Sequence, residues 1–342
     1  MVREIMKKSL EDRIERAAPG AVSLDSIQMR DLLVTISRLY YKDDRSHLEI
    51  AKATGLSRFQ VAKLLKKARE DGVVRIEIQE SVFTDATLEG LIERASHLRR
   101  AIVVRTREKE DPEEVKRRVG VAGAVFLGQI LRNGDVLGVS WGSTVNAVAE
   151  ALDNRKRHVE VVQINGGGHW IPVDMSAHEI TRRFANKFGT QPHLLHAPIM
   201  VDSEEVRDTL LLDSTIRETT RLFEHINTAL LGIGSLYPTA TPTLRLGGLQ
   251  EEEFEELRRL GAVGDVFRHF FSKEGTFVDT PLAKRVISIP VDHLPRLEYS
   301  IGVATGVEKA LAIAGAIRGQ LITVLVTDDR TAQVVAAALS TQ

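Results

Sequence analysis

One short stretch of the sequence has the side chains expected of a DNA-binding helix. Between Leu56 and Arg69 there are several basic residues and no acidic one. A helix with such a face fits the major groove of double-stranded DNA, with its first residues near base edges and its lysines near phosphates. The side chains predicted to bind DNA are Ser57, Arg58, Phe59, Gln60, Lys63, Lys66 and Lys67.

A second set of residues has the chemistry of a phosphate site. Free amides at a helix N-terminus can bind an anion together with hydroxyl groups such as those of Ser143 and Thr144, and Lys309 would add a positive charge. None of the loops concerned has the spacing of a dinucleotide-binding motif or of a P-loop. A phosphorylated small molecule is therefore the predicted ligand. Four glycine- and hydroxyl-rich loops, each following a predicted strand, provide these groups: 138–144, 165–168, 232–235 and 304–309.

The basic helix belongs to a predicted helix-turn-helix over residues 46–72. Leu48, Ile50 and Ala51 would lie on the apolar side of a short first helix, and Gly55 marks a turn whose left-handed backbone is easy only for glycine. Ser57 is a suitable N-cap for the second helix. The buried face of that helix repeats at three- and four-residue steps, at Val61, Leu64, Leu65 and Ala68. The alternative interpretation is an ordinary solvated helical hairpin with a basic face.

Two further elements complete a predicted DNA-binding domain over residues 24–80. An amphipathic helix over 26–41 would pack against the helix-turn-helix. Residues 73–80 alternate between apolar and polar, which predicts a strand, and a strand after a recognition helix serves as a wing. Arg75 would be placed there to contact phosphate. Residues 1–22 form a charged extension with no assigned role.

From residue 84 onward the pattern changes to helices alternating with β-branched, apolar strands. Such alternation predicts an α/β fold, a doubly wound and mostly parallel sheet that is covered on both faces. Ligands bind such sheets beyond the carboxyl ends of the strands. This second domain is predicted to span 84–342. The expected helices are 84–99, 113–131, 143–152, 176–188, 250–259 and 307–317. The expected strands are 101–104, 135–140, 159–165, 193–198, 228–234, 285–291, 300–305 and 322–327.

The composition limits the classes of function. The 342 residues are 43% hydrophobic and 27% charged, and the net charge of −1 favours a local basic patch over a uniformly basic protein. The absence of cysteine excludes disulfides, thiolate chemistry and cysteine-ligated metals. No apolar run approaches the ~20 residues that span a bilayer, and the N-terminus is too charged for a signal peptide. We therefore expect a cytoplasmic protein with no membrane partner.

The sequence resembles one known family, the SorC-type sugar-binding transcriptional regulators, which are often grouped with DeoR-like regulators. The resemblance covers residues 26–335 and rests on the helix-turn-helix, GVSWGSTV, the Asn-Gly-Gly after a strand, AHEI, LLGIGSL, GAVGD and the glycine–lysine helix start. It implies a winged helix-turn-helix head joined to a larger Rossmann-like α/β effector domain similar to phosphosugar isomerases. It also implies a bacterial homo-oligomer, a dimer or commonly a tetramer, whose affinity for operator DNA is set by a phosphorylated sugar.

The resemblance also implies roles for individual residues. Those of 142–144 would form the phosphate cradle with Lys309, those of 165–167 would border the sugar, and Asp265 would accept hydrogen bonds from sugar hydroxyls. Some members have a basic residue where Asn165 stands, to hold a second phosphate, so Asn165 favours a singly phosphorylated or smaller sugar. The predicted effector contacts are Gly142, Ser143, Thr144, Asn165, Gly166, Gly167, Ser176, His178, Gly234, Ser235, Asp265 and Lys309.

Three interpretations of the whole chain remain at this point. The leading one is a transcriptional regulator, most simply a repressor of a sugar-catabolism operon, with no catalytic residues, cofactor or metal. The alternative is a phosphosugar isomerase-like enzyme with an appended DNA-binding head, but adjacent helical residues such as Glu308 and Lys309 diverge by ~100° and make a poor acid/base pair. The third is a constitutive DNA-binding scaffold. His178 is expected to bind hydroxyls or support the fold, because the sequence places no second ligand four residues away.

Overall fold

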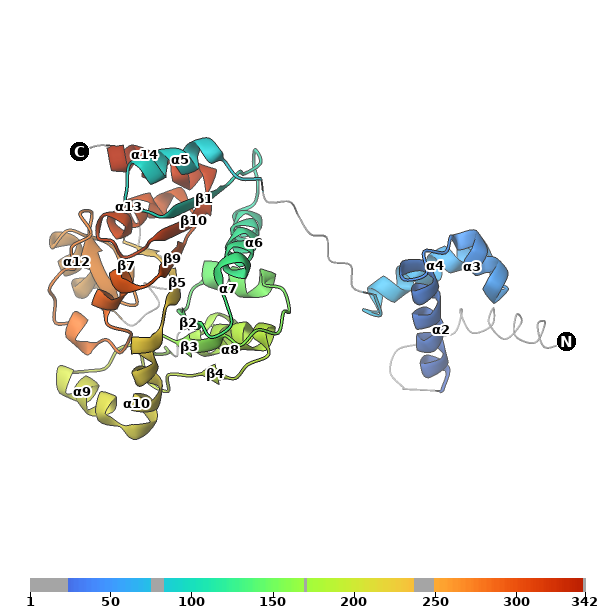
Figure 1. Ribbon diagram of the computed structural model, residues 1–342, viewed down its shortest axis with the longest axis horizontal. Helices are drawn as coiled ribbons and strands as arrows, with labels where there is room; N and C mark the ends of the chain where they lie inside the picture. The colour runs from blue at the N-terminus through green and yellow to red at the C-terminus, as the bar shows by residue number, and fades with distance from the viewer. Residues whose placement is uncertain (1–23, 75–82, 169–170, 237–248, 341–342) are drawn as a thin grey trace. The chain divides into compact units, whose positions relative to one another are not determined.

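A computed structural model describes residues 24–74, 83–168, 171–236 and 249–340, apart from the side chains of 24–28 and 174. The chain divides into two compact units, residues 1–80 and 81–342 (Figure 1). The N-terminal extension, most of the predicted wing strand with Arg75, and Trp170 lie outside the described residues. The two units are described separately below.

The described part of the smaller unit is built on three helices: α2 (Leu24–Tyr41), α3 (His47–Thr54) and α4 (Arg58–Glu70). Helices α3 and α4 form the predicted helix-turn-helix, and local sequence explains each end. Ser46 and Ser57 each accept a backbone hydrogen bond as N-cap within a complete capping box. Gly55 ends α3 with φ 76°, the left-handed conformation that its lack of a Cβ permits. The predicted apolar faces meet in one small core, except that the prediction for Leu48 is wrong: it is 45% exposed and lies outside the core. The buried members are Leu33, Ile36, Ile50, Ala51, Val61, Leu64, Leu65 and Ala68.

The larger unit is organised around a seven-stranded parallel sheet in the order β1-β10-β9-β5-β2-β3-β4. At its centre Val139 pairs with Gln163 on one side and Leu230 on the other. The predicted parallel sheet is confirmed. Its strands are β1 (Arg100–Val104), β2 (Val136–Val139), β3 (Glu160–Gln163), β4 (Pro192–His193), β5 (Thr228–Gly232), β9 (Tyr299–Val303) and β10 (Val324–Asp328).

Helices cover both faces of this sheet, as Figure 1 shows. One core contains apolar side chains of α6 (Pro112–Ile130), α7 (Ser143–Ala151) and α8 (Ala177–Phe188) against one face. The other contains those of α5 (Ala86–Arg94), α13 (Ala310–Arg318) and α14 (Asp329–Ser340). Strand residues therefore alternate between two buried faces, which explains their nearly continuous apolar character.

A second, three-stranded antiparallel sheet lies beside the main one. It contains β6 (Gly234–Ser235), β7 (Ala262–Val266) and β8 (His269–Ser272). Residues 261–265, which contain the predicted effector contact Asp265, largely form the central strand of this sheet. Residues 228–234, expected as one strand, supply strands to both sheets.

Two predicted strands differ from the structure. The strand expected at 193–198 is reduced to the two residues of β4, and the strand expected at 285–291 is absent. Residues 285–291 lie between two 3₁₀ turns, η3 (Ala283–Arg285) and η4 (Val291–Arg296), and join no strand of either sheet. They make only isolated bridges, Ser288 with Asn165 and Val286 with Met200. Pro290 has no amide hydrogen to donate, which opposes a continuous ladder. The apolar run reflects burial of this segment rather than pairing in a sheet.

The remaining described elements connect these layers. They are η1 (Val173–Met175), α9 (Glu204–Leu212), α10 (Ser214–Thr220), η2 (Arg221–His225), α12 (Glu251–Arg259) and η5 (Val307–Lys309). Helices match the predicted ranges closely, except that 84–99 shortens to α5 and 307–317 begins with the tighter turn η5. Among the described helices, none is long and apolar enough to cross a membrane.

Candidate functional sites

The exposed face of α4 has the composition that the sequence predicts. Arg58, Lys63, Lys66 and Lys67 are all exposed, and the ring of Phe59 is 81% exposed in the first turn of the helix. An aromatic ring so open to water lacks the burial that normally stabilises it, so a partner surface would gain by covering it. Phe59 therefore marks the N-terminal end of α4 as a contact surface.

The basic residues of α4 differ in their engagement. Lys66 and Lys67 form i,i+4 ion pairs with Glu70 and Asp71, at 3.7 and 2.9 Å, and exposed pairs of this kind contribute little to stability. Within the described part of the chain, no ion pair engages Arg58 or Lys63. The two side chains nearest the predicted base-reading end are thus the ones available to a new partner.

Two of the predicted DNA contacts also have a local structural role. Ser57 Oγ accepts a hydrogen bond from the Gln60 amide at 3.2 Å, and Gln60 Oε1 accepts one from the Ser57 amide at 2.8 Å. This reciprocal pair closes the capping box and fixes the first turn of α4. The side-chain nitrogen of Gln60, Nε2, is the donor that this arrangement leaves for a base edge.

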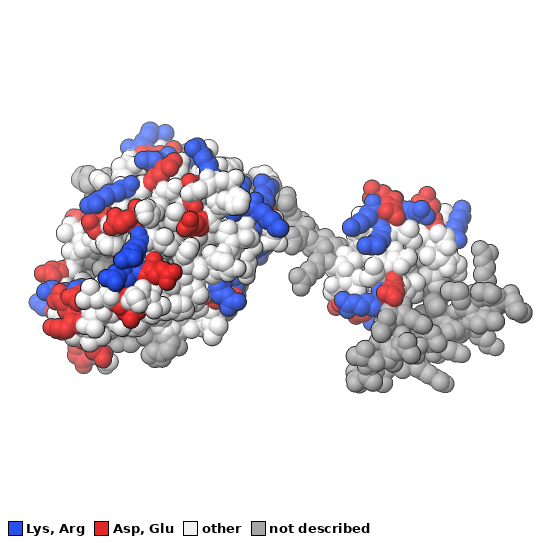
Figure 2. Space-filling model, turned by 60° about the horizontal axis from the view of Figure 1, so that its bottom comes forward, with Lys and Arg blue, Asp and Glu red and all other residues white. Residues whose placement is uncertain are grey.

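Charge on the larger unit is mixed. In Figure 2 acidic and basic side chains alternate over the visible face of that unit, with no broad field of one sign. Electrostatic attraction of DNA by such a surface is weak. The exposed face of α4 is the stronger candidate for the nucleic-acid interface.

The candidate ligand pocket lies where the order of the parallel strands reverses. From β2 the chain adds β3 and β4 on one side, whereas β5, β9 and β10 follow on the other. The loops after β2 and β5 are held together by hydrogen bonds from the Ser140 amide to the Leu230 carbonyl, 3.1 Å, and from the Gly232 amide to Ser140 Oγ, 3.2 Å. A switch point of this kind is the usual ligand site of an open α/β sheet.

A small cavity of about 60 Å³ opens at this switch point. The start of α7 forms one wall, where Gly142 adopts φ 131° and supplies no side-chain cap. The first amides of α7 therefore have no side-chain acceptor and are suited to an anion. The predicted contacts that line this cavity are Gly142, Ser143, Thr144, Gly234, Asp265 and Lys309.

Lys309 is the central cation of this site. It extends from η5, whose loop is anchored because the Gly306 amide donates to Thr331 Oγ1 at 2.9 Å and to Asp328 Oδ2 at 3.3 Å. Burial lowers the pKa of Lys309, opposed by the charges of Glu308 and Asp265. Within the described residues its ammonium group makes no hydrogen bond and no ion pair. A half-buried lysine in this state would gain from an anionic ligand.

The sequence interpretation missed one residue of this cavity, Arg268. It is fully buried, and its guanidinium carbon lies 5.9 Å from the centre of the Trp141 ring. Phe267 and Arg268 form the β7–β8 turn with φ of 51° and 68°, a conformation that costs most residues roughly 1–2 kcal/mol. The sequence signal that could have revealed it is an arginine within the largely apolar segment 262–271, where a charged side chain is unusual. Backbone strain of this kind is typical of functional sites.

Asp265 and Arg268 form an electrostatic unit beside Lys309. The Arg268 amide donates to Asp265 Oδ2 at 3.0 Å. Burial raises the pKa of Asp265, while the positive charges of Arg268 and Lys309 oppose that rise. Burial likewise lowers the pKa of Arg268, against the charge of Asp265. The cavity thus contains two cationic groups and one carboxylate, a balance that favours an anion with hydroxyl groups attached.

A much larger cavity, about 1200 Å³, adjoins the small one. Ser143 and Lys309 line both cavities and so form their common border. The walls of the large cavity come from the first turns of α6, the outer side of α7, the 305–309 loop and the end of β10. The sequence did not predict this space, because no single motif forms it.

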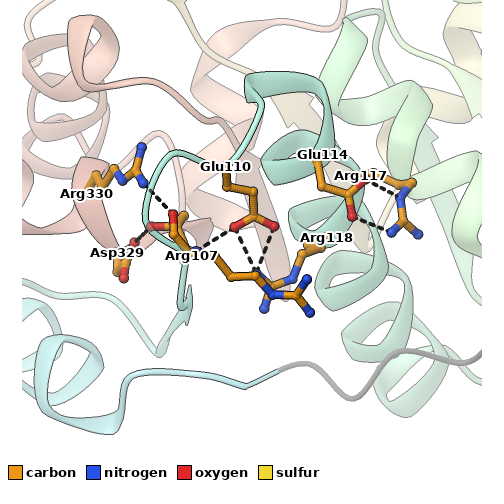
Figure 3. Close-up of polar contacts among 8 residues, drawn as sticks. Arg107, Glu110, Glu114, Arg117, Arg118, Asp329 and Arg330 are labelled. Carbon is orange, nitrogen blue, oxygen red and sulfur yellow. Dashed lines mark hydrogen bonds and ion pairs between the residues drawn. The ribbon is translucent and has the colours of Figure 1, made fainter.

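The rim of the large cavity is fixed by the ion-pair network in Figure 3. Glu110 Oε2 accepts a hydrogen bond from the Arg107 amide at 2.7 Å. Both carboxylate oxygens of Glu110 also accept from Arg118 Nη1, each at 3.1 Å. The Glu110 and Arg118 side chains are only 4% and 8% exposed. On the other side, Arg330 Nη2 donates to the Arg107 carbonyl at 2.6 Å. The loop between β1 and α6 is therefore held from both ends.

Six predicted effector contacts line neither cavity: Asn165, Gly166, Gly167, Ser176, His178 and Ser235. The Asn165 side chain is fully buried, and its Nδ2 donates to the Gly166 carbonyl at 2.9 Å. Ser176 Oγ caps α8 by accepting from the Glu179 amide at 3.2 Å. Ser235 is also fully buried, and its Oγ donates to the Glu308 carbonyl at 3.0 Å, which supports η5. Their contact with a ligand stays a prediction.

His178 lies in a small histidine pair. Its ring centre is 5.5 Å from that of His196, and burial, followed by the charge of His196, lowers its pKa. Among the residues that the structure describes, no group of three or more His, Cys, Asp or Glu side chains is placed to hold a metal ion. The arrangement around His178 is that of a neutral imidazole within the fold.

Comparison with known proteins agrees with both units. Residues 80–337 match the family model described as a putative sugar-binding domain. The chain is 29% identical over 310 residues to the sorbitol operon regulator of Klebsiella pneumoniae, covering 88% of this chain and 96% of that one. It is 31% identical over 307 residues to the deoxyribonucleoside regulator of Bacillus subtilis, covering 90% and 97%.

Solved structures extend the similarity to the fold of the whole chain. The full-length sorbitol operon regulator SorC from Klebsiella pneumoniae superposes with a TM-score of 0.69 at 29% identity, covering 90% of this chain and 99% of that one. The putative sugar-binding domain of a transcriptional repressor from Vibrio fischeri gives 0.67 at 29% identity, covering 75% and 99%.

Two findings define the class of protein. The chain combines a helix-turn-helix unit with a doubly wound unit that contains a candidate anion pocket, and the relatives reported above are transcriptional regulators. This is a DNA-binding transcriptional regulator rather than an isomerase. The chain belongs to the SorC-type family of sugar-binding transcriptional regulators.

Proposed function

We propose that this regulator represses a sugar-catabolism operon and that a phosphorylated sugar controls its affinity for operator DNA. The observation that carries the proposal is Lys309, a half-buried ammonium with no partner among the described residues. It lies beside the uncapped first turn of α7. A phosphate would accept charge-assisted hydrogen bonds from both, whereas a neutral ligand could offer the lysine ammonium only weaker acceptors.

The proposed effector contacts follow from this cavity. The amides and hydroxyls of Ser143 and Thr144, with Lys309 and Arg268, bind the phosphate, and Asp265 accepts from a neighbouring sugar hydroxyl. Thr144 is 3% exposed, so its hydroxyl is held in place by the surrounding helix. Gly142 and Gly234 have no side chains, so the phosphate can approach the backbone closely. The segment 165–167 and residues Ser176 and His178 remain predicted as a more distant boundary of the sugar.

The proposed DNA contacts follow from the exposure of α4. Arg58 and Gln60 reach base edges, Phe59 contacts a thymine methyl group, and Lys63, Lys66 and Lys67 contact phosphates. A homo-oligomer, dimer or tetramer, would place two copies of α4 in successive major grooves about 34 Å apart on an inverted repeat. Binding of the effector then favours one oligomer geometry by on the order of 1–3 kcal/mol.

The proposal assigns no catalytic step to the pocket. Asp265 accepts a hydrogen bond from the Arg268 amide and faces two cations, so it lacks the freedom of a general base. Glu308 is adjacent to Lys309 in η5 and diverges from it. Incubation with hexose and pentose phosphates should therefore leave the sugars unchanged in an NMR spectrum, and any isomerised product would contradict this part of the proposal.

Fluorescence anisotropy of the full-length protein on DNA from upstream of its own gene tests the proposal. The titration is repeated with triose, pentose, hexose and polyol phosphates and with their unphosphorylated forms. We expect one phosphorylated compound to shift the DNA dissociation constant at least fivefold, and its unphosphorylated form to have no effect. Tight DNA binding that no compound alters would contradict control by a sugar phosphate.

Two variants distinguish the pocket from a general charge effect. Lys309→Gln should abolish the response to the effector while leaving DNA affinity unchanged. Lys284→Gln is the matched control, because Lys284 is 59% exposed, pairs with Glu204 at 3.7 Å and lines neither cavity. A normal response from Lys309→Gln would place the effector elsewhere.

A further inference from the structure

The small cavity at the switch point is too small for a whole sugar phosphate. Its volume of about 60 Å³ accommodates a phosphate with its first bonded atoms, or a handful of water molecules. Small-molecule sites generally occupy at least about 300 Å³. The rest of the effector must therefore extend out of this cavity, and the direction in which it extends decides which residues determine specificity.

The large cavity offers a continuation that has adequate volume. It measures about 1200 Å³ and meets the small cavity at Ser143 and Lys309. Residues 165–167, on the other side, are occupied with the fold: the Gly166 amide donates to the Ile287 carbonyl at 2.9 Å and the Gly167 amide to the Ala197 carbonyl at 2.9 Å. A ligand held by its phosphate at α7 would therefore extend toward α6.

Most carboxylates of the large cavity already have partners. Glu110 pairs with Arg118, and Glu150 Oε1 accepts from Arg183 at 3.2 Å and from Asn146 at 2.8 Å. Asp328 accepts from the amide and the hydroxyl of Thr331. The two ion pairs offset part of the negative charge of the wall, and the hydrogen bonds from Thr331 fix the Asp328 carboxylate in place.

Lys116 differs from these groups. Its side chain is 20% exposed, and it reaches into the cavity from the second turn of α6. Among the described residues its one partner is Glu113, at 2.6 Å, but that carboxylate is 78% exposed, and ion pairs of this kind contribute at most about 1 kcal/mol. The charge of Lys116 also contributes to the lowered pKa of Lys309. Two ammonium groups that repel each other thus share one cavity.

We propose that Lys116 binds a second acidic group of the effector in the large cavity, while the first, a phosphate, occupies the small cavity at α7. The proposal rests on the proposed function and deepens it by naming the effector class. The effector is a sugar derivative with two anionic groups, either a bisphosphate or a phosphorylated sugar acid. An anion between the two lysines would relieve their mutual repulsion and replace a weak surface pair.

This inference changes the significance of Asn165. A neutral residue at that position favours a singly phosphorylated sugar only if the ligand extends toward it. The Asn165 side chain is fully buried and lines neither cavity. The charge that selects the second acidic group is instead on α6, in a segment that no sugar-binding motif of the sequence includes.

Isothermal titration calorimetry on the full-length protein tests the proposal with four probes: orthophosphate, fructose 6-phosphate, fructose 1,6-bisphosphate and 6-phosphogluconate. We expect the two doubly anionic sugars to bind the wild-type protein about tenfold more tightly than fructose 6-phosphate. Lys116→Gln should remove that advantage, since a charge-assisted hydrogen bond is lost. Its affinity for orthophosphate should change less than twofold. Lys116→Arg should retain the advantage.

Arg258→Gln is the matched control, because Arg258 forms an i,i+3 pair with Glu255 at 2.9 Å and lines neither cavity. An unchanged preference for doubly anionic probes in Lys116→Gln, or no such preference in the wild-type protein, would overturn the proposal. If orthophosphate and fructose 6-phosphate still bind and Lys309→Gln weakens them, the proposed function survives that failure. If the wild-type protein binds none of the four probes, the proposed function fails as well.

Discussion

The two functional regions of this regulator are built in different ways. The proposed DNA-binding face lies on one contiguous helix, α4, whose caps, buried side and exposed side all come from residues within 27 positions of each other, 46–72. The proposed effector pocket combines residues of α7, β6, β7 and η5, which are separated by up to about half the chain. A region of the first kind depends on local contacts, and one of the second kind depends on the packing of the whole sheet.

The two units should differ most in stability when a buried ion pair of the larger unit is broken. Glu110→Gln leaves the Arg118 guanidinium, whose side chain is 8% exposed, without its carboxylate. Loss of one partner of a buried pair costs about 3–5 kcal/mol. We expect urea denaturation of the full-length chain to show that decrease in the larger unit, with hydrogen exchange of α3 and α4 unchanged.

Glu114→Gln provides the control on the same helix. Glu114 pairs with Arg117 at 2.6 Å, but the two side chains are 39% and 49% exposed, so its loss should cost less than about 1 kcal/mol. Equal destabilisation by the two variants would contradict the distinction between the buried rim pair and the exposed pair in Figure 3.

The pH dependence of stability should also originate in the larger unit. Burial, followed by the charge of Arg207, lowers the pKa of His269 from 6.5 to about 4. The unfolded chain therefore takes up a proton near pH 6.5, before the folded one, and stability falls as the pH decreases from 6.5 to 4. Because one pKa unit corresponds to about 1.4 kcal/mol, the loss is about 3 kcal/mol.

Urea denaturation of the wild-type protein and of His269→Gln at pH 7 and pH 4 measures this contribution. The difference between the two proteins should shrink toward pH 4, because the other titrating groups are common to both. A difference that does not depend on pH would show that His269 titrates alike in the folded and unfolded states.

The same contrast explains which features the sequence could predict. The helix-turn-helix, the α7 cradle and the position of Lys309 follow from short motifs, because a turn glycine, an N-cap and a strand end are determined by neighbouring residues. Arg268 was missed because its burial depends on a β7–β8 turn packed near Trp141, more than 100 positions earlier. Asn165 was placed at the end of the correct strand, but the 286–289 segment that covers it has no local signature.

Substitutions on the DNA-binding face should have intermediate effects that depend on position. Arg58→Ala removes a side chain near base edges and should weaken operator binding by about 1–3 kcal/mol, with reduced discrimination between sequences. Lys66→Ala should weaken binding to all sequences alike and reduce the salt slope by about one. Anisotropy titrations over a salt series, on operator and unrelated DNA, separate these outcomes. Identical behaviour of the two variants would contradict the proposed orientation of α4.

The smallest expected effect tests whether the DNA-binding region is as local as its sequence suggests. Ser57→Ala and Ser46→Ala each remove one capping hydroxyl, with hydrogen-bond distances of 3.2 and 3.3 Å to the third residue of the helix. Each should lower the stability of the smaller unit by about 1 kcal/mol, measured by hydrogen exchange within α3 and α4 of the full-length protein. Neither should affect phosphate binding.

The two caps differ in what they position, and this makes Ser46→Ala the matched control. Ser57 fixes the first turn of α4, where Arg58 and Gln60 lie, whereas Ser46 fixes α3. Fraying of that first turn should weaken operator binding in Ser57→Ala beyond its effect on stability, whereas Ser46→Ala should bind DNA almost normally. If both variants lose DNA affinity equally, the two helices act as one body, and α4 is positioned by the core of the smaller unit rather than by its own cap.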